Sequence, residues 1–246
     1  MTSYETWIFV RNPFLLIAQK SLKKFYVVVN EHGSRLKASA SHPDIHFLSQ
    51  RFQPVGEAFK KAYRQWRISE DMQRAATLEI SQLLDALSKD KLVYWDASIR
   101  AKYGSRGHEY TALMGVGKNA FRNGKKDIRI ENVIALGKRL KEFAPLAALQ
   151  IEVEAYGKLL KEARSKQIGS IKEKRDALQS LREQKDQTCM MLYRNVGRLM
   201  DIFYDSPRKI TDFFPMELIR KPSKKKPEIV ELEEEEQEDW LPEGEE

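Results

Sequence analysis

The sequence predicts an all-α protein, an elongated antiparallel bundle of about five to seven helices with a disordered, charged C-terminal tail. Two observations support this fold class. Apolar residues recur at three- and four-residue steps over most of the 246 residues, which is the spacing of amphipathic helices. Charged residues make up 32% of the chain, against only 12 Gly and 9 Pro, and this balance favours long solvated helices over a turn-rich sheet protein.

The first predicted helix begins at an N-cap signature. Asn12 is a capping residue type, and Pro13 after it fits the first helical position, where a proline costs no hydrogen bond. The apolar pattern that follows predicts a helix over about 13–30, ended by Gly33.

Two further helices are predicted before the first glycine-rich segment. Pro43 begins one of them, and Pro54 and Gly56 are expected to kink or divide it. Another helix is predicted over about 71–102 and should end at Gly104.

The second half of the chain is dominated by one long helical pattern. Residues 104–126 form the only long glycine-rich stretch, and Asp127 is expected to cap the helix after it. From Pro145 to residue 204 the apolar spacing hardly breaks. One continuous helix of that length would extend about 90 Å at about 1.5 Å per residue, so two helices with a turn near Gly169 are favoured as more compact.

Residues 164–188 contain few apolar side chains, and those present form a narrow seam suited to pairing with one neighbouring helix. A helical hairpin projecting from the bundle is therefore predicted there. Otherwise residues 1–220 are expected to form one helical bundle domain.

The net charge of +7 is the sum of two opposed regions. Residues 1–220 hold 39 basic and 25 acidic side chains, a net charge of +14. Residues 221–246 hold 4 basic and 11 acidic side chains, a net charge of −7, with the lysines first and the acids after them. The latter segment has few apolar side chains to bury, so it is predicted to be a flexible tail.

The sequence argues against membrane insertion, a secretory signal and an internal disulfide. The apolar runs at 7–10 and 14–18 are too short to cross a bilayer, so no membrane insertion is expected. The N-terminal residues lack the basic start and continuous apolar segment of a secretory signal. Because Cys189 is the single cysteine, no internal disulfide can form, and a cytoplasmic location is predicted.

The stretch GVGKNAFRNGKK, residues 115–126, resembles the end of a phosphate-binding loop but fails the Walker A pattern. The required first glycine is Ala112, and the required hydroxyl residue is Asn119. No hydrophobic strand precedes it either, so a P-loop nucleotide site is excluded.

A simpler anion site remains as a hypothesis at this stretch, because basic side chains precede a helix start, where free backbone amides favour negative charge. The candidate residues are Lys118, Arg122, Lys125 and Lys126. The alternative interpretation is a plain helix connection, in which Gly117 and Gly124 permit tight turns and Phe121 anchors the loop in the core.

No catalytic residue, metal site or cofactor is predicted. His42 and His46 have a metal-binding spacing but no recognisable third ligand. Cys189 lies in the apolar sequence TCMML and is expected to be an inert core residue. Glu152 and Glu154 lie on different faces of a helix and are expected to be solvated.

These observations favour a non-enzymatic interaction or structural protein, which binds a protein partner or associates with itself. The alternative is a protein that binds nucleic acid or another polyanion through its basic body and is modulated by its acidic tail, although no helix-turn-helix, zinc or RNA-binding signature occurs. A weaker alternative is an enzyme with an anion site at residues 115–126.

Overall fold

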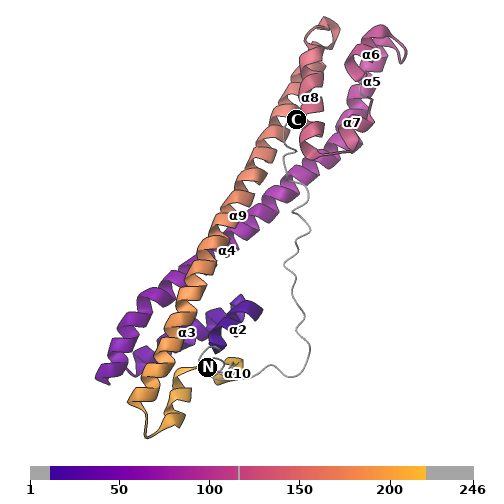
Figure 1. Ribbon diagram of the computed structural model, residues 1–246. Coiled ribbons are helices and arrows are strands. Elements are labelled where there is room, and N and C mark those ends of the chain that lie inside the picture. The colour runs from indigo at the N-terminus through magenta and orange to yellow at the C-terminus, as the bar shows by residue number, and fades with distance from the viewer. Residues whose placement is uncertain (1–11, 116, 220–246) are drawn as a thin grey trace, which may run out of the picture. The chain divides into compact units, whose positions relative to one another are not determined.

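The computed structural model describes residues 12–115 and 117–219, and their regular structure consists of helices (Figure 1). No strand occurs in these two ranges, so the all-α prediction is confirmed. The chain divides into two compact units. Unit 1 comprises Met1–Tyr63 and Ser180–Glu246, and unit 2 comprises Arg64–Gln179. The flexible tail predicted for residues 221–246 lies outside the described residues.

Unit 1 is built from both ends of the chain. Its elements are α2 (Pro13–Lys20), α3 (Leu22–Ala38), the first part of α4 (Pro43–Ala86), the last part of α9 (Ala147–Ile202), the 3-10 helix η3 (Pro207–Phe213) and α10 (Met216–Ile219).

Unit 2 is built from the middle of the chain. Its elements are the rest of α4, the π-helical segment η1 (Leu87–Lys91), α5 (Leu92–Tyr103), α6 (His108–Met114), α7 (Asn119–Arg122), α8 (Lys126–Leu140), the 3-10 helix η2 (Ala144–Leu146) and the rest of α9.

The N-terminal helix begins as predicted but ends early. The Asn12 side chain accepts a hydrogen bond from the backbone N–H of Phe14 at 3.0 Å, which confirms the N-cap. The single helix predicted over 13–30 is wrong, because Ser21 has an extended backbone between α2 and α3. Its hydroxyl caps α3, which then continues through Gly33. The apolar pattern over residues 13–30 therefore spans two helices, which Ser21 separates by capping the second one.

Both long helical patterns form unbroken helices, contrary to two of the predicted divisions. Helix α4 continues through Pro54, and α9 continues through Gly169, so the turn predicted there and the hairpin predicted at 164–188 are wrong. A helical glycine costs about 1 kcal/mol, less than the packing of its neighbours supplies. Glycine alone therefore does not end a helix.

The core of unit 1 combines buried phenylalanine rings with aliphatic side chains. Phe25 and Phe59 pack edge to face with their ring centroids 5.0 Å apart, and Phe14 contacts Phe214 at 5.4 Å. All four rings are buried. Such pairs add to the stabilisation from burial alone, and Phe214 lies just after η3, so the C-terminal segment closes the core.

The core of unit 2 is mainly aliphatic around one indole. Trp95 is fully buried and meets Tyr156 edge to face at 5.8 Å. Phe121 is also fully buried, which confirms its predicted role as an anchor. Leu78 and Ile128 fit the apolar pattern of the sequence, yet they are more than half exposed.

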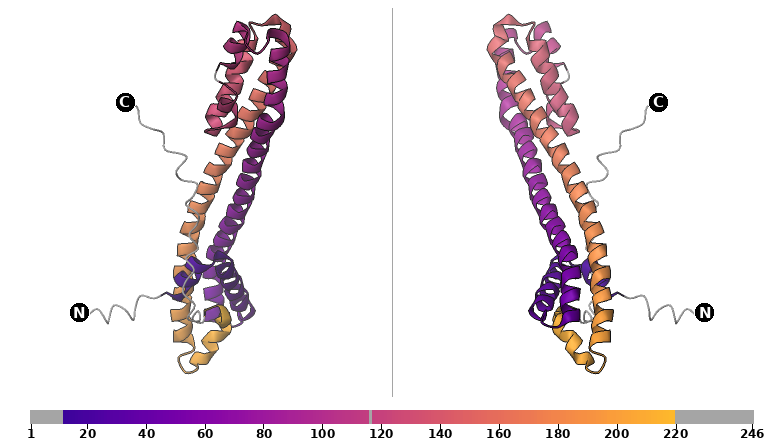
Figure 2. Two further views of the ribbon diagram at one scale, coloured as in Figure 1. Left: turned by 90° about the vertical axis from the view of Figure 1, so that its right-hand side faces the viewer. Right: turned by 90° about the vertical axis from the view of Figure 1, so that its left-hand side faces the viewer.

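Within unit 2, α4 and α9 lie side by side, as Figures 1 and 2 show. Their contact is polar as well as apolar. Gln167 and Gln73 are buried, and each donates a hydrogen bond to the Thr77 hydroxyl, at 3.1 and 3.2 Å. The two-helix seam predicted from apolar spacing is thus formed partly by amide side chains, while Ile171 and Leu178 are only half-buried.

Candidate functional site

The four predicted anion-binding residues lie in and around the short helix α7 (Asn119–Arg122). Lys118 directly precedes α7, and its Nζ lies 2.6 Å from Asp96 Oδ2. Arg122 is the last residue of α7, Lys125 is the N-cap residue of α8, and Lys126 is its first residue. Lys118 therefore neutralises a carboxylate of its own unit, and the other three remain as candidates.

Asp96 is the centre of a polar cluster on α5. Its carboxylate is largely buried and accepts a hydrogen bond from the Tyr110 hydroxyl at 2.7 Å, and Arg100 Nε lies 3.0 Å from it. Burial raises the pKa of Asp96, but the hydrogen bonds from Lys118 and Tyr110 and the nearby positive charges outweigh burial and lower it below 3.8. The cluster ties α5, α6 and the start of α7 together.

The start of α8 differs from its prediction. The helix begins at Lys126, so Asp127 lies in the first turn and is not the cap. Asp127 accepts two hydrogen bonds from Arg164, at 2.8 and 2.9 Å, and these lower the pKa of its carboxyl group. Gly117 and Gly124 have φ of 71° and 96°, which confirms the expected tight turns.

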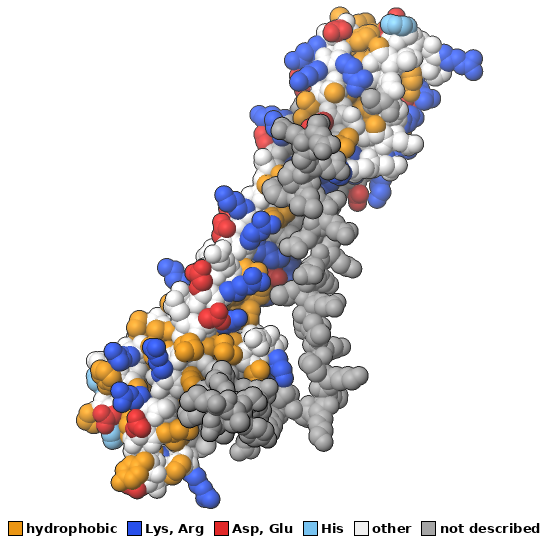
Figure 3. Space-filling model, in the orientation of Figure 1, with side chains coloured by type: hydrophobic (Ala, Val, Ile, Leu, Met, Phe, Trp, Pro, Cys, Tyr) orange, Lys and Arg blue, Asp and Glu red, His pale blue; other side chains and the backbone are white. Residues whose placement is uncertain are grey.

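Basic side chains are concentrated in one part of unit 2. Residues 100–141 hold 11 Lys and Arg against 3 Asp and Glu. Within the described ranges, no ion pair involves six of these basic residues. They are Lys102, Arg106, Arg122, Lys125, Lys126 and Lys138. Figure 3 shows basic side chains distributed over the surface of this unit. We call these six residues the unpaired cations of unit 2.

The histidines at the start of α4 and the single cysteine were the other candidate sites. The described residues contain no cluster of three or more His, Cys, Asp or Glu that could hold a metal. His46 bonds to Gln50, and His42 lies 3.8 Å from Asp44. Cys189 is fully buried, and burial raises its pKa to about 12, so it is an inert thiol at neutral pH.

The two glutamates expected to be solvated are held in ion pairs. Glu152 accepts hydrogen bonds from Lys91 Nζ at 2.8 Å and from Trp95 Nε1 at 3.3 Å, and the bond from Lys91 is the main cause of its lowered pKa. Glu154 Oε1 lies 3.1 Å from Lys141 Nζ. Sequence spacing did not reveal these pairs, because their partners are distant in the chain.

The π-helical segment η1 is braced by side chains from α8 and α9. Arg129 donates hydrogen bonds to the carbonyl groups of Leu84 and Phe121, both at 2.9 Å, and Tyr156 donates to the carbonyl of Leu83 at 2.7 Å. A π-helical turn disturbs the regular backbone bonding of a helix, so carbonyls beside it need other donors. These two side chains supply them.

His32 was not singled out by the sequence, yet it is fully buried in unit 1. Its ring stacks on Phe214 with centroids 4.3 Å apart. Nδ1 lies 2.9 Å from the Phe213 carbonyl, which can only accept, so Nδ1 carries the proton. Nε2 then accepts a hydrogen bond from Asn195 Nδ2 at 3.0 Å. Burial lowers the pKa of His32 to about 4.

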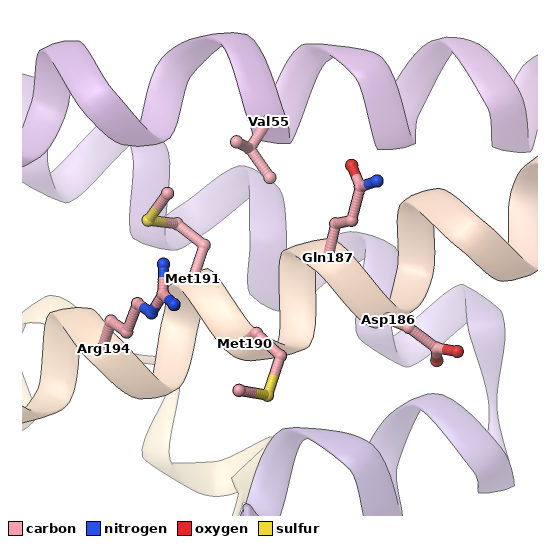
Figure 4. A pocket seen from close by; sticks show the side chains of 6 residues that line it. All are labelled: Val55, Asp186, Gln187, Met190, Met191 and Arg194. Atoms are coloured by element: carbon pink, nitrogen blue, oxygen red, sulfur yellow. The ribbon is translucent and has the colours of Figure 1, made fainter.

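An open groove of about 450 Å³ lies in unit 1, and Figure 4 shows its lining. Met191 and Gln187 of α9 point toward Val55 of α4, while Met190 and Asp186 point to the other side of α9. Arg194 completes the lining. The groove is therefore mainly apolar with polar groups along its rim.

An apolar row continues along α9 beyond the groove. Met190 is 50% exposed, Tyr193 37%, Met200 56% and Tyr204 76%. Met190, Tyr193, Gly197 and Met200 follow one another at steps of three and four, which places them on one side of α9, and Tyr204 lies in the turn that follows Ile202. We call these five residues the α9 row, and Figure 3 shows hydrophobic side chains exposed on this unit.

Comparison of the chain with protein-family models, with curated proteins and with solved structures gives no match. Among the described residues, no helix combines the length and the apolar character needed to cross a membrane. Any functional conclusion for this chain therefore comes from its own side chains.

Proposed function

We propose that this protein is a non-enzymatic helical scaffold that binds protein through unit 1. The observation that supports the proposal most directly is the α9 row, in which two methionines and two tyrosines are exposed along the end of α9 and the turn after it. Monomeric proteins leave single apolar side chains exposed, but a row of them beside a groove is typical of an interaction surface.

The side-chain chemistry of this surface fits a helical protein partner. Methionine adapts its shape to irregular surfaces, and tyrosine supplies a large contact area at low entropic cost. The groove beside the row adds Met191 and Val55 as further apolar contacts. Because Cys189 is a buried thiol that forms no disulfide, we place this binding in the reducing cytoplasm.

Chemical crosslinking of the full-length protein in its source cells tests the proposal. The unaltered chain should give discrete adducts, and the double variant Met200→Glu with Tyr204→Glu should lose them, because two charges would have to be desolvated in the contact. Both side chains are exposed, so the variant should still fold.

Ile151→Glu provides a matched control. Ile151 is 67% exposed on the same helix but lies in unit 2, so its substitution should leave the adducts unchanged. If the control removes the adducts as completely as the double variant does, or if no adduct forms with the unaltered chain, the proposal is wrong.

Polyanion binding by unit 2 is a second candidate, supported by the unpaired cations. They are exposed or half-buried and form no ion pair within the described ranges, so phosphate groups that bind them would release counterions. Arg122, Lys125 and Lys126 are the closest together in sequence, and they adjoin the start of α8.

Salt-dependent binding to a DNA duplex and to polyphosphate tests this candidate. Alanine at Arg122, Lys125 and Lys126 should lower the slope of log affinity against log salt concentration by about 2 to 3. The control variant has alanine at Lys161, Lys172 and Arg175, three exposed cations of α9 in the same unit. Equal losses in both variants, or no binding at low salt, would exclude a specific basic site.

A further inference from the structure

Gly197 occupies the centre of the α9 row, although the fold of unit 1 does not require a glycine there. A Cβ atom added at this position would meet nothing within 4 Å. The backbone is helical, so no unusual dihedral angle explains the residue. Glycine inside a helix weakens it, whereas a glycine on an exposed face lets the backbone of another helix approach closely.

The residues around Gly197 form a pattern that is complementary to itself. Met190 lies seven residues before it and Tyr204 seven after it, while Tyr193 lies four before and Met200 three after. When two copies cross in antiparallel orientation at Gly197, Met190 faces Tyr204 of the second copy, and Tyr193 faces Met200 of the second copy. Each tyrosine ring then meets a methionine sulfur, which is a favourable contact.

The charged residues beside the row are also complementary in this antiparallel arrangement. Arg194 and Asp201 lie three residues before and four residues after Gly197, on the same flank of the row, which lies toward the groove. The two-fold operation brings Arg194 opposite Asp201 of the second copy and repeats the pair by symmetry. Within the described part of the chain no ion pair involves Arg194, and Asp201 reaches only the exposed Arg198, at 3.7 Å.

From these three features we infer that the partner of the α9 row is a second copy of this chain. The proposed dimer is antiparallel, with its two-fold axis at Gly197, and it rests on the proposed scaffold function. A single helix face per copy lies at the small end of protein interfaces, so the dimer should be reversible and form at about micromolar concentration.

Disulfide trapping of the full-length protein tests this axis. In the variant Gly197→Cys the two new thiols would face each other across the axis, so mild oxidation should give a covalent dimer on a non-reducing gel. The native Cys189 is fully buried and should not react.

Gly169→Cys is the matched control for the trapping experiment. Gly169 lies on the same helix and also has nothing within 4 Å of an added Cβ, but it belongs to unit 2. Its variant should remain monomeric under the same oxidation. Equal trapping in both variants, or none with Gly197→Cys, would overturn the inference.

Sedimentation equilibrium gives an independent readout of the charge pairs. Arg194→Asp should raise the dimer dissociation constant about tenfold or more, and the double variant Arg194→Asp with Asp201→Arg should restore it, because the pair is re-formed with reversed signs. Failure of the second substitution to restore dimerisation would contradict the antiparallel register.

The two proposals fail in different ways. If the purified chain stays monomeric while a crosslinked adduct with another protein still depends on Met200 and Tyr204, self-association is wrong and the scaffold function stands. An adduct between the row and residues 220–246 of the same chain would also overturn self-association. If the unaltered chain gives no adduct of either kind, both proposals are wrong.

Discussion

The two units of this protein manage polar groups in different ways. Unit 1 buries a neutral histidine within an aromatic core, where Phe213 and Asn195 satisfy both ring nitrogens. Unit 2 keeps an aliphatic core and binds its acids in ion pairs, such as Asp96 with Lys118 and Asp127 with Arg164. Their stability should therefore respond to different perturbations.

The two units also differ in net charge. Unit 2 has 23 basic and 15 acidic residues, a net charge of +8, so the remainder of the chain carries −1 of the total of +7. Unit 1 instead exposes the α9 row. The unpaired cations therefore lie on unit 2 and the α9 row lies on unit 1, although unit 2 also exposes apolar side chains such as Ile68 and Ile151.

The largest expected effect comes from removing one core ring in each unit. Trp95→Ala and Phe59→Ala should each cost about 3 to 5 kcal/mol, because both side chains are fully buried. Hydrogen exchange should show lost protection mainly in α5 and α8 for the first variant, and mainly in α3 for the second. A uniform loss over both units in either variant would show that they unfold as one domain.

The stability of the two units should fall in different ranges of acidic pH, because the units contain different titratable groups. The folded pKa of His32 is about 4 against an ordinary 6.5, so the unfolded chain binds the extra proton first as pH falls. Unit 1 should lose up to about 3 kcal/mol of stability between pH 6.5 and 4, a loss that is absent above this window. His32→Gln should remove this dependence, as measured by urea unfolding at each pH.

The carboxylates of unit 2 should respond only at lower pH. Asp96, Asp127 and Glu152 have pKa values lowered below 3.8 for Asp and 4.5 for Glu, so their stabilisation is present above those values and lost as pH falls through the folded values. If unit 2 already loses protection from hydrogen exchange at pH 6, this comparison is wrong.

A smaller effect is expected from the brace on η1. Arg129→Met should cost about 1 to 3 kcal/mol, because the Phe121 carbonyl loses its side-chain donor while Ser88 still bonds to the Leu84 carbonyl. Thermal unfolding would measure the loss. Met fills a similar volume, so an unchanged melting temperature would mean that the hydrogen bonds of Arg129 do not stabilise unit 2.

The smallest effects concern the two exposed glycines of α9. Gly169→Ala should stabilise the protein by up to about 1 kcal/mol, since alanine favours helix and no atom lies within 4 Å of the new Cβ. Gly197→Ala should give the same gain in dilute, monomeric protein but raise the dimer dissociation constant. An equal effect of both variants on association would count against a special role for Gly197.

The sequence by itself determined the helical class, the Asn12 cap, the end of α5 at Gly104, the buried Phe121 and the inert Cys189. These features depend on neighbouring residues in the chain, since a cap or an apolar period acts within one or two turns. Most of the expected helices were therefore found, whereas their ends were less accurate. The break between α2 and α3 at Ser21 was not predicted, whereas the turn predicted near Gly169 does not occur.

Only the tertiary structure decided which charged and polar residues pair. Lys118 was one candidate residue for an anion site, and the structure pairs it with Asp96. His32 had no sequence signal, yet it contacts Phe213, which is 181 residues away. The tertiary structure also decided that Met190 and Met200 stay exposed while Leu192 and Leu199 of the same helix are buried. The apolar period specifies a helical face, but the choice of the face that is covered depends on which distant segments pack against it.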